Sequence, residues 1–376
     1  MTALRIQGRI EAVKYTTSQI IALDETDYKD LNVNDHSTIL IAMDDQNKMA
    51  LSRWTGPKRT RTYPFASVYD TYGFSGKRIT VIPIIKDEGS DTNNDRINFI
   101  TLSWMNLLNV YIILAWYEAA DKRSKTRITN QSLNNEWVLR KIREISNFQL
   151  DAHHWNNEHF INDFSHVLNK AVNSYQKIEK ELNVTLHRSS DHYSNFINNF
   201  YSFNDINKIS LPKFAEYTLK RSRMAAAREV QTIHELELLQ DNSIKAVFEL
   251  RNNLGGEYFL TADDVYTRGD TLIIQEANNS TKSPLPSNSD LKDGLFKIIL
   301  YSNLHKVIIG DKPYPAKAQI RLTGIGIQGK LQLPDNGNKL EEFVSINCLS
   351  ETYIERINWL NEEAKLNRFQ VIIESN

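Results

Sequence analysis

The stretch from residue 244 to residue 277 constrains the fold of this chain more than any other part of its sequence. Its apolar residues come in short runs, "IKAVFELR", "EYFLT", "DVYTR" and "TLIIQEA", separated by Gly, Asn and Asp. Such runs between turn-forming residues are typical of consecutive antiparallel strands. Helical patterns precede them in residues 213–240 and follow them in "LKDGLFKIILYSNLHKV". This order predicts an α/β (α+β) domain with a mixed central sheet flanked by helices.

Pro212 marks the expected boundary between two domains. A chain of 376 residues is long enough for about two of them. Residues 1–50 contain short alternating runs that are typical of strands. In residues 134–204 the apolar residues are spaced three and four apart, as in helices. We therefore expect an N-terminal strand-plus-helix region, residues 1–211, that recognises DNA if the chain binds it, and a second domain over residues 212–376.

The cysteine content and the N-terminus indicate a cytoplasmic protein. Cys348 is the only cysteine, so the chain has neither an internal disulfide nor a Cys/His zinc spacing. The start, "MTALRIQGRI", carries charges where a signal peptide needs an apolar core. Residues 102–120 are largely apolar, but their dense part, residues 107–117, is about half of the roughly 20 residues that a bilayer requires. We expect a buried helix there and no membrane partner.

Basic residues are concentrated locally rather than across the chain. Lys and Arg number 45 against 46 Asp and Glu, so a polyanion would need a local basic patch. Residues 52–74 interleave basic and aromatic side chains with Pro and Gly. A solvated basic face is one interpretation, and contact with a DNA backbone is the other. In the second interpretation the DNA-binding residues are Arg53, Lys58, Arg59, Arg61, Tyr63 and, on the helix after the meander, Lys292.

Acidic residues stand at two related positions of the meander. Asp263 and Asp264 precede the tight turn at residues 268–270, and Glu276 ends the apolar run beyond it. Because side chains alternate along a strand, Asn278 is expected on the same face as Glu276. Acids at strand ends are often simply solvated. The other interpretation is a Mg²⁺ site, because magnesium takes one or two carboxylates and keeps several waters.

The acid on one strand, followed by an acid on the next, resembles the pattern of the PD-(D/E)XK nuclease superfamily, which includes many type II restriction endonucleases. Longer strings also resemble one group of those enzymes: "TRTYPFASVYDTY", "VIPIIKDEG", "LLNVYIILAWY", "AAAREVQT", "NNLGGEYFLTADDV" and "LPSNSDLKDGLFKIILYSNL". The resemblance covers about residues 60 to 310. Its most specific string is "DLKDGLFKIIL".

The resemblance implies a PD-(D/E)XK restriction-endonuclease-like core and a type II restriction endonuclease. Such an enzyme is a homodimer that uses Mg²⁺ to hydrolyse phosphodiester bonds in double-stranded DNA at a short specific sequence. Its two-fold symmetry matches the symmetry of the site. The implied metal ligands are Asp263 or Asp264 together with Glu276. The implied catalytic residues are these acids, Asn278 and, as a further acid from a helix, Glu229.

The sequence departs from the superfamily pattern at Asn278, where the pattern has lysine. A lysine stabilises developing phosphate charge, whereas an amide only donates a hydrogen bond. One explanation is that another lysine reaches the site. The alternative is a catalytically weak or inactive sequence-specific DNA-binding protein with a nuclease-like fold. The candidate lysines are Lys245, Lys282, Lys292 and Lys297.

Overall fold

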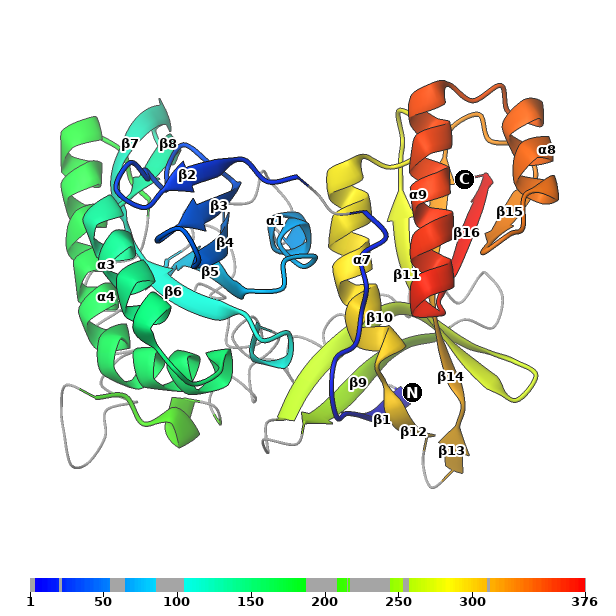
Figure 1. The fold of residues 1–376 in the computed structure, drawn as a ribbon, viewed down its shortest axis with the longest axis horizontal. Coiled ribbons are helices and arrows are strands. Elements are labelled where there is room, and N and C mark those ends of the chain that lie inside the picture. Colours follow the sequence, from blue (N-terminus) through cyan, green and yellow to red (C-terminus); the bar gives the residue numbers. More distant parts are fainter. Residues whose placement is uncertain are drawn as a thin grey trace. The chain divides into compact units, whose positions relative to one another are not determined.

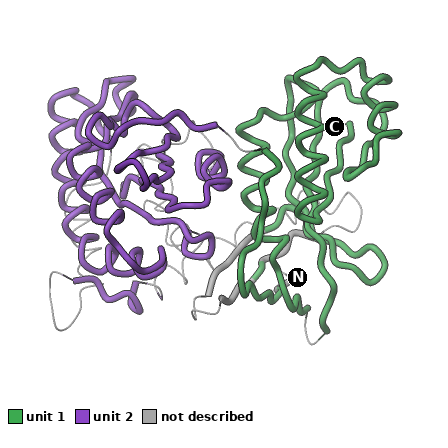
Figure 2. Tube along the Cα trace, viewed as in Figure 1, with its two compact units in different colours: residues 1–21, 219–376 green, residues 22–218 purple. Residues whose placement is uncertain are grey.

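The chain forms two compact units that mix helices with mixed β-sheets. The computed structural model describes residues 4–19, 22–54, 65–85, 105–186, 208–214, 216, 244–252, 257–309 and 312–375. Figure 2 shows unit 1, residues 1–21 with 219–376, and unit 2, residues 22–218. The division falls at residue 218 rather than at 211, and the first 21 residues belong with the C-terminal part of the chain.

Unit 1 is built on a mixed nine-stranded sheet (Figure 1). In spatial order its strands are β13 (Lys312–Tyr314), β12 (His305–Ile309), β1 (Leu4–Ile10), β9 (Ile244–Asn252), β10 (Glu257–Arg268), β11 (Thr271–Asn279), β14 (Ala316–Gly324), β16 (Gln370–Ser375) and β15 (Lys330–Leu333). β9, β10 and β11 form the expected antiparallel meander. β1 pairs in parallel with β9, and this pairing places the N-terminus in unit 1.

One long strand, β10, replaces the two strands expected between residues 257 and 268. The register of β10 against β9 shifts between Ala262 and Val265. Gly269, with φ +60°, occupies the tight turn into β11, a conformation that glycine adopts without steric cost. Asp264 then pairs with Gln275, and Arg268 pairs with Thr271.

The described helices of unit 1 pack on the strands from β11 to β15 in the spatial order. They are α7 (Asn288–Ser302), α8 (Asn338–Ile346) and α9 (Glu351–Asn367). α7 packs on β11 and β14, and α9 packs on β15 and β16. The register joins Glu276, Ile320, Val371 and Leu333 in one row across these four strands. The helix expected over residues 213–240 lies outside the described residues, apart from residues 213, 214 and 216.

The helix expected to continue to residue 307 is shorter in the structure. α7 ends at Ser302, and His305–Ile309 is strand β12, which pairs with β1. Asn303 follows the helix and binds the N-terminal segment: its side chain accepts from the N–H of Lys14 and donates to the Lys14 carbonyl. The residue that caps the end of the helix, Asn303, therefore also holds the segment that follows β1.

Unit 2 contains a five-stranded sheet in the order β2 (Glu25–Asp27), β3 (Thr38–Ala42), β4 (Lys48–Arg53), β5 (Lys77–Pro83) and β6 (Tyr111–Ala115). β7 (Tyr117–Ser124) and β8 (Arg127–Leu133) form a separate hairpin. The described helices are α1 (Phe65–Asp70), α3 (Asn135–Asn147) and α4 (Ala152–Leu182). The helical prediction for residues 134–204 therefore holds for α3 and α4.

The buried helix expected within residues 102–120 is wrong, because residues 111–115 form strand β6 and β7 begins at residue 117. All five residues of β6 are buried, and a fully buried strand has the same uninterrupted apolar pattern as a buried helix. Its β-branched and aromatic residues fit a pleated strand. Among the described residues, no helix has the length and apolar character to cross a membrane.

Side chains from α3 and α4 close the free edge of β6. Asn156 accepts a hydrogen bond from the N–H of Ile112 (2.7 Å), and the indole of Trp155 donates to the Ile112 carbonyl (2.9 Å). The indole of Trp137 donates to the Leu114 carbonyl (2.8 Å). These groups replace a neighbouring strand, so the edge is satisfied without further pairing.

Candidate active site

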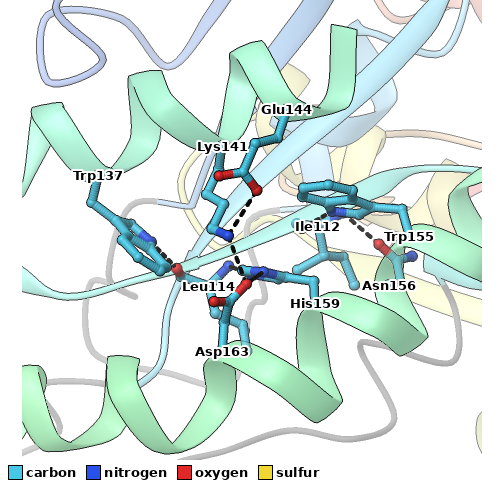
Figure 3. A network of polar contacts seen from close by, with 9 residues as sticks. All are labelled: Ile112, Leu114, Trp137, Lys141, Glu144, Trp155, Asn156, His159 and Asp163. Carbon is cyan, nitrogen blue, oxygen red and sulfur yellow. Dashed lines mark hydrogen bonds and ion pairs between the residues drawn. The ribbon is translucent and has the colours of Figure 1, made fainter. Parts of the chain in front are cut away.

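Two clusters of buried titratable side chains stand out in the described residues. The first, in unit 2, is centred on His159 (Figure 3). Its Nε2 accepts from the N–H of Leu114 (2.9 Å), so the ring proton lies on Nδ1 and is donated to Asp163 (2.7 Å). Lys141 bridges Asp163 (2.7 Å) and Glu144 (2.8 Å). Both ring nitrogens are occupied, so His159 has neither a free lone pair for a metal nor one for a substrate proton.

The electrostatics of this cluster agree with a structural role. Burial lowers the pKa of His159, which keeps the ring neutral. Burial alone would raise the pKa of Asp163, but hydrogen bonds and charges from His159 and Lys141 outweigh it and bring the pKa to about 2. The cluster is thus a satisfied ion-pair network that holds α3 and α4 against the edge of β6.

The second cluster, in unit 1, is centred on Glu276. This residue is 5 % exposed and stands in a row whose next members across the sheet, Ile320, Val371 and Leu333, are fully buried. α7 covers this part of the row. Lys297 of α7 forms a hydrogen-bonded ion pair with Glu276 Oε1. A carboxylate has therefore been placed where the sheet is otherwise apolar.

Asp263 of β10 lies beside Glu276. One Asp263 oxygen accepts from the N–H of Ala277 (3.0 Å), which fixes this carboxylate against β11. Burial raises the pKa of Glu276 to about 8; the charge of Asp263 and a hydrogen-bonding contact with it also raise the pKa, and Lys297 opposes them. Two carboxylates in such contact require a shared proton or a cation between them.

The same surroundings include a buried tyrosine. Tyr301 lies one turn beyond Lys297 on α7, and burial raises its pKa well above the ordinary value, with further contributions from the charges of Glu276 and Asp263. Its ring also lies near Phe248 of β9, with 6.0 Å between the ring centroids. Sequence reasoning missed Tyr301. Its spacing of four residues from Lys297 places both on one helix face, which is the only signal for it in the sequence.

Asp264 faces away from Glu276. It pairs with Gln275 in the ladder and accepts from the Gln275 side chain (2.7 Å). Gln275 in turn contacts Gln319, which donates to the hydroxyl of Tyr266 (2.8 Å). Of the two aspartates that the sequence left open as ligands, the structure brings Asp263 to Glu276 and puts Asp264 in this polar row on the opposite face.

Asn278 shares the face of Glu276, as alternation predicts, but its amide binds α7. Asn278 Nδ2 donates to the carbonyl of Asp290 (2.6 Å). A Cβ at Gly294 would stand 2.7 Å from Asn278 Nδ2 and 2.8 Å from Ile320, so α7 crosses the sheet closely at this glycine. The Asn278 amide therefore contacts the helix that carries Lys297, and a catalytic role for Asn278 stays a prediction.

One of the four candidate lysines reaches the strand acid. Of the four candidates, Lys297 contacts Glu276, whereas Lys282 is exposed in the loop before α7 and Lys292 is half-buried near its start. The side chain of Lys245 lies outside the described residues. An ammonium group therefore reaches the strand acid from the following helix rather than from the strand itself.

Of the remaining predicted site residues, Arg53 is described. Glu229, Lys58, Arg59, Arg61 and Tyr63 lie outside the described residues. Arg53 is half-buried in unit 2, where its Nε donates to the carbonyl of His36 (3.0 Å). Burial lowers its pKa. Arg53 therefore contacts its own unit through Nε, and its contact with DNA stays a prediction.

The Asp263–Glu276 pair suits a hard divalent cation. Glu276 Oε2 is buried and accepts no hydrogen bond within the described part of the chain. No group of three or more His, Cys, Asp and Glu residues there is arranged to hold a metal. Two carboxylates with an unsatisfied oxygen fit Mg²⁺, which keeps several waters, better than they fit a metal that needs a full protein ligand set.

Comparisons with known proteins assign the chain to no family. No protein-family model, no curated protein and no solved structure matches the chain.

Proposed function

We propose that the chain is a Mg²⁺-dependent endonuclease that hydrolyses phosphodiester bonds in double-stranded DNA at a short specific sequence, as a type II restriction endonuclease with a PD-(D/E)XK-like core does. The observation that carries the proposal is the meeting of Asp263, Glu276 and Lys297 on β10, β11 and α7. A homodimer would present one such site to each DNA strand.

In this proposal Asp263 and Glu276 hold the cation. When bound, Mg²⁺ supplies a more acidic water and neutralises charge on the phosphate. Glu276 must ionise for this, and Lys297 favours its ionised form. With the cation bound, the ammonium of Lys297 would donate to a phosphate oxygen on which negative charge develops.

A catalytically inactive DNA-binding protein is the second candidate. The direct contact between Lys297 and Glu276 Oε1 favours it, because the ammonium already occupies a carboxyl oxygen that a cation would bind. Asn278 at the lysine position of the motif points the same way.

Incubation with phage DNA separates the two candidates. Discrete fragments in MgCl2, and none in EDTA, are expected from the endonuclease. Glu276→Gln should abolish cleavage while retaining DNA binding, since it keeps the shape of the side chain and removes its charge. The matched control is Glu362→Gln, an exposed acid on α9 that pairs with Lys365 (2.8 Å). DNA retardation by the parent without cleavage in MgCl2 would favour the inactive protein.

A further inference from the structure

The hairpin of β7 and β8 has the most concentrated positive charge of the described surface of unit 2. Residues 122–127 read "KRSKTR", which is four cations and no acid in six residues. All six are exposed. Ser124 pairs with Arg127, so Lys125 and Thr126 form the two-residue turn at the tip. Since the whole chain has a net charge of −1, such a local patch is where a polyanion would be attracted.

The hairpin is held in place from its inner side. Lys122 donates to the carbonyls of Leu182 (2.8 Å) and Asn183 (2.9 Å) at the carboxyl end of α4, where the helix dipole favours a cation. The N–H of Thr185 donates to the Lys125 carbonyl (2.8 Å), which fixes the backbone of the turn. The ribbon is therefore a positioned element rather than a free loop, and Lys122 is committed to its anchoring.

The other three cations of the tip are not used in this way. The side chains of Arg123, Lys125 and Arg127 make no hydrogen bond or ion pair with any described residue. The two acids of the hairpin form no ion pair with these cations: Asp121 accepts from Asn130 (2.8 Å), and Glu118 accepts from Asn134 (3.0 Å). Three exposed cations thus lie within five residues at the tip of this two-stranded ribbon.

We propose that this tip is a DNA-contacting element of unit 2, in which Arg123, Lys125 and Arg127 bind backbone phosphates of duplex DNA. The inference rests on the proposed function, because it assigns where that DNA is held. The major groove of B-form DNA admits a two-stranded ribbon, and cations at its tip then meet the phosphates that border the groove. The contacts position the duplex and are independent of its sequence.

The test compares duplex binding by the full chain and by the triple variant Arg123→Gln, Lys125→Gln, Arg127→Gln. EDTA prevents cleavage, and the salt concentration is varied from about 50 to about 200 mM. Each lost phosphate contact should reduce the slope of log K against log salt by about 0.9. The dissociation constant at about 100 mM salt should rise at least about tenfold for every duplex tried.

A second triple variant controls for the change in total charge. Lys170→Gln, Lys177→Gln, Lys180→Gln also removes three exposed lysines from unit 2, on α4, and should leave the slope nearly unchanged. Equal losses from both triple variants would overturn the hairpin proposal, as would a parental slope in the hairpin variant. Both of these outcomes leave the proposed function standing, whereas a parent that binds no duplex DNA overturns both proposals. A-form RNA has a deep, narrow major groove, so an equal loss on duplex RNA would also contradict a ribbon at the DNA groove.

Discussion

Lys297 of α7 is hydrogen-bonded to Glu276 of β11, a residue 21 positions earlier in the chain. The contact joins a sheet acid to a helix cation in a row that is otherwise apolar. A buried ion pair costs desolvation that its own attraction often fails to repay, so hydrophobic residues would stabilise the fold equally well or better. The pair is therefore better explained by chemistry than by stability.

Replacing Lys297 tests that explanation. We expect Lys297→Met to reduce DNA cleavage about 10²- to 10³-fold, because one donor to the developing charge is lost. Lys297 lowers the pKa of Glu276, so its removal should raise that pKa. The pH at which the cleavage rate begins to rise should then also be higher. Single-turnover rates across the pH range measure both effects.

The control for this change is Lys365→Met, which removes an exposed lysine of α9. It should leave the rate and the pH profile unchanged. If Lys297→Met cleaved at the parental rate, Lys297 would have no part in the mechanism, and only the two carboxylates would be left as catalytic groups.

Glu276 also predicts how stability depends on pH. Its pKa is about 8 in the folded chain, against an ordinary value of 4.5. Between these values the unfolded chain loses the proton while the folded chain keeps it, so this group makes the free energy of unfolding fall as pH rises. The slope from one proton is at most about 1.4 kcal/mol per pH unit, and it vanishes above about pH 8.

Urea unfolding of the parent and Glu276→Gln at several pH values, without divalent cations, measures this contribution. The free energy of unfolding of Glu276→Gln, minus that of the parent, should increase as pH rises from about 5 to about 8. A difference that stays constant over this range would show that Glu276 is already ionised at its lower end.

The sequence predicted the meander and its strand acid because both depend on local patterns. Strand alternation by itself puts Glu276 and Asn278 on one face. Alternation could not choose between Asp263 and Asp264, because the register of β10 shifts between Ala262 and Val265 and a shift of one residue exchanges the two faces.

Other features depend on contacts between distant segments. Lys297 reaches Glu276 only because α7 crosses β11 closely at Gly294, and the sequence alone left four lysines as candidates. Residues 1–21 join unit 1 through pairing of β1 with β9 and β12, which no local pattern reveals. The strand β6 looks helical because all five of its residues are buried, so it lacks the alternation of apolar and polar residues that marks a strand with one solvated face.

The packing between Asn278 and α7 yields a third prediction. Gly294→Ala should destabilise unit 1, because the new methyl group would overlap Asn278 Nδ2 and Ile320. Asn278→Ala should cost about 1 kcal/mol through the lost hydrogen bond to Asp290. The double variant should be more stable than the sum of the two losses implies, since removing the amide gives the methyl group room. Thermal unfolding of the four proteins measures this coupling, and strict additivity would contradict the close crossing.

Asn278→Lys is expected to fail for the same reason. Restoring the lysine of the superfamily pattern would bring a longer, charged side chain against Gly294 and break the bond to Asp290. The variant should lose stability and cleavage together. Cleavage at or above the parental rate would mean that the strand position, and not Lys297, is where a lysine acts.

Cation binding can be measured without cleavage, and it supplies the last prediction. Mg²⁺ that binds only the folded chain raises its thermal stability by mass action. Because the cation competes with the proton that burial holds on Glu276, its effect should be small near pH 6 and should grow toward pH 8 and above. Asp263→Asn and Glu276→Gln should each abolish the effect, whereas Asp264→Asn should keep it, since Asp264 faces Gln275 on the other side of the sheet. If Asp264→Asn removed the stabilisation and Asp263→Asn retained it, the assignment of the two aspartates would be reversed. A parent whose unfolding temperature ignores Mg²⁺ at every pH would show that Lys297 already satisfies Glu276, as the inactive DNA-binding protein requires.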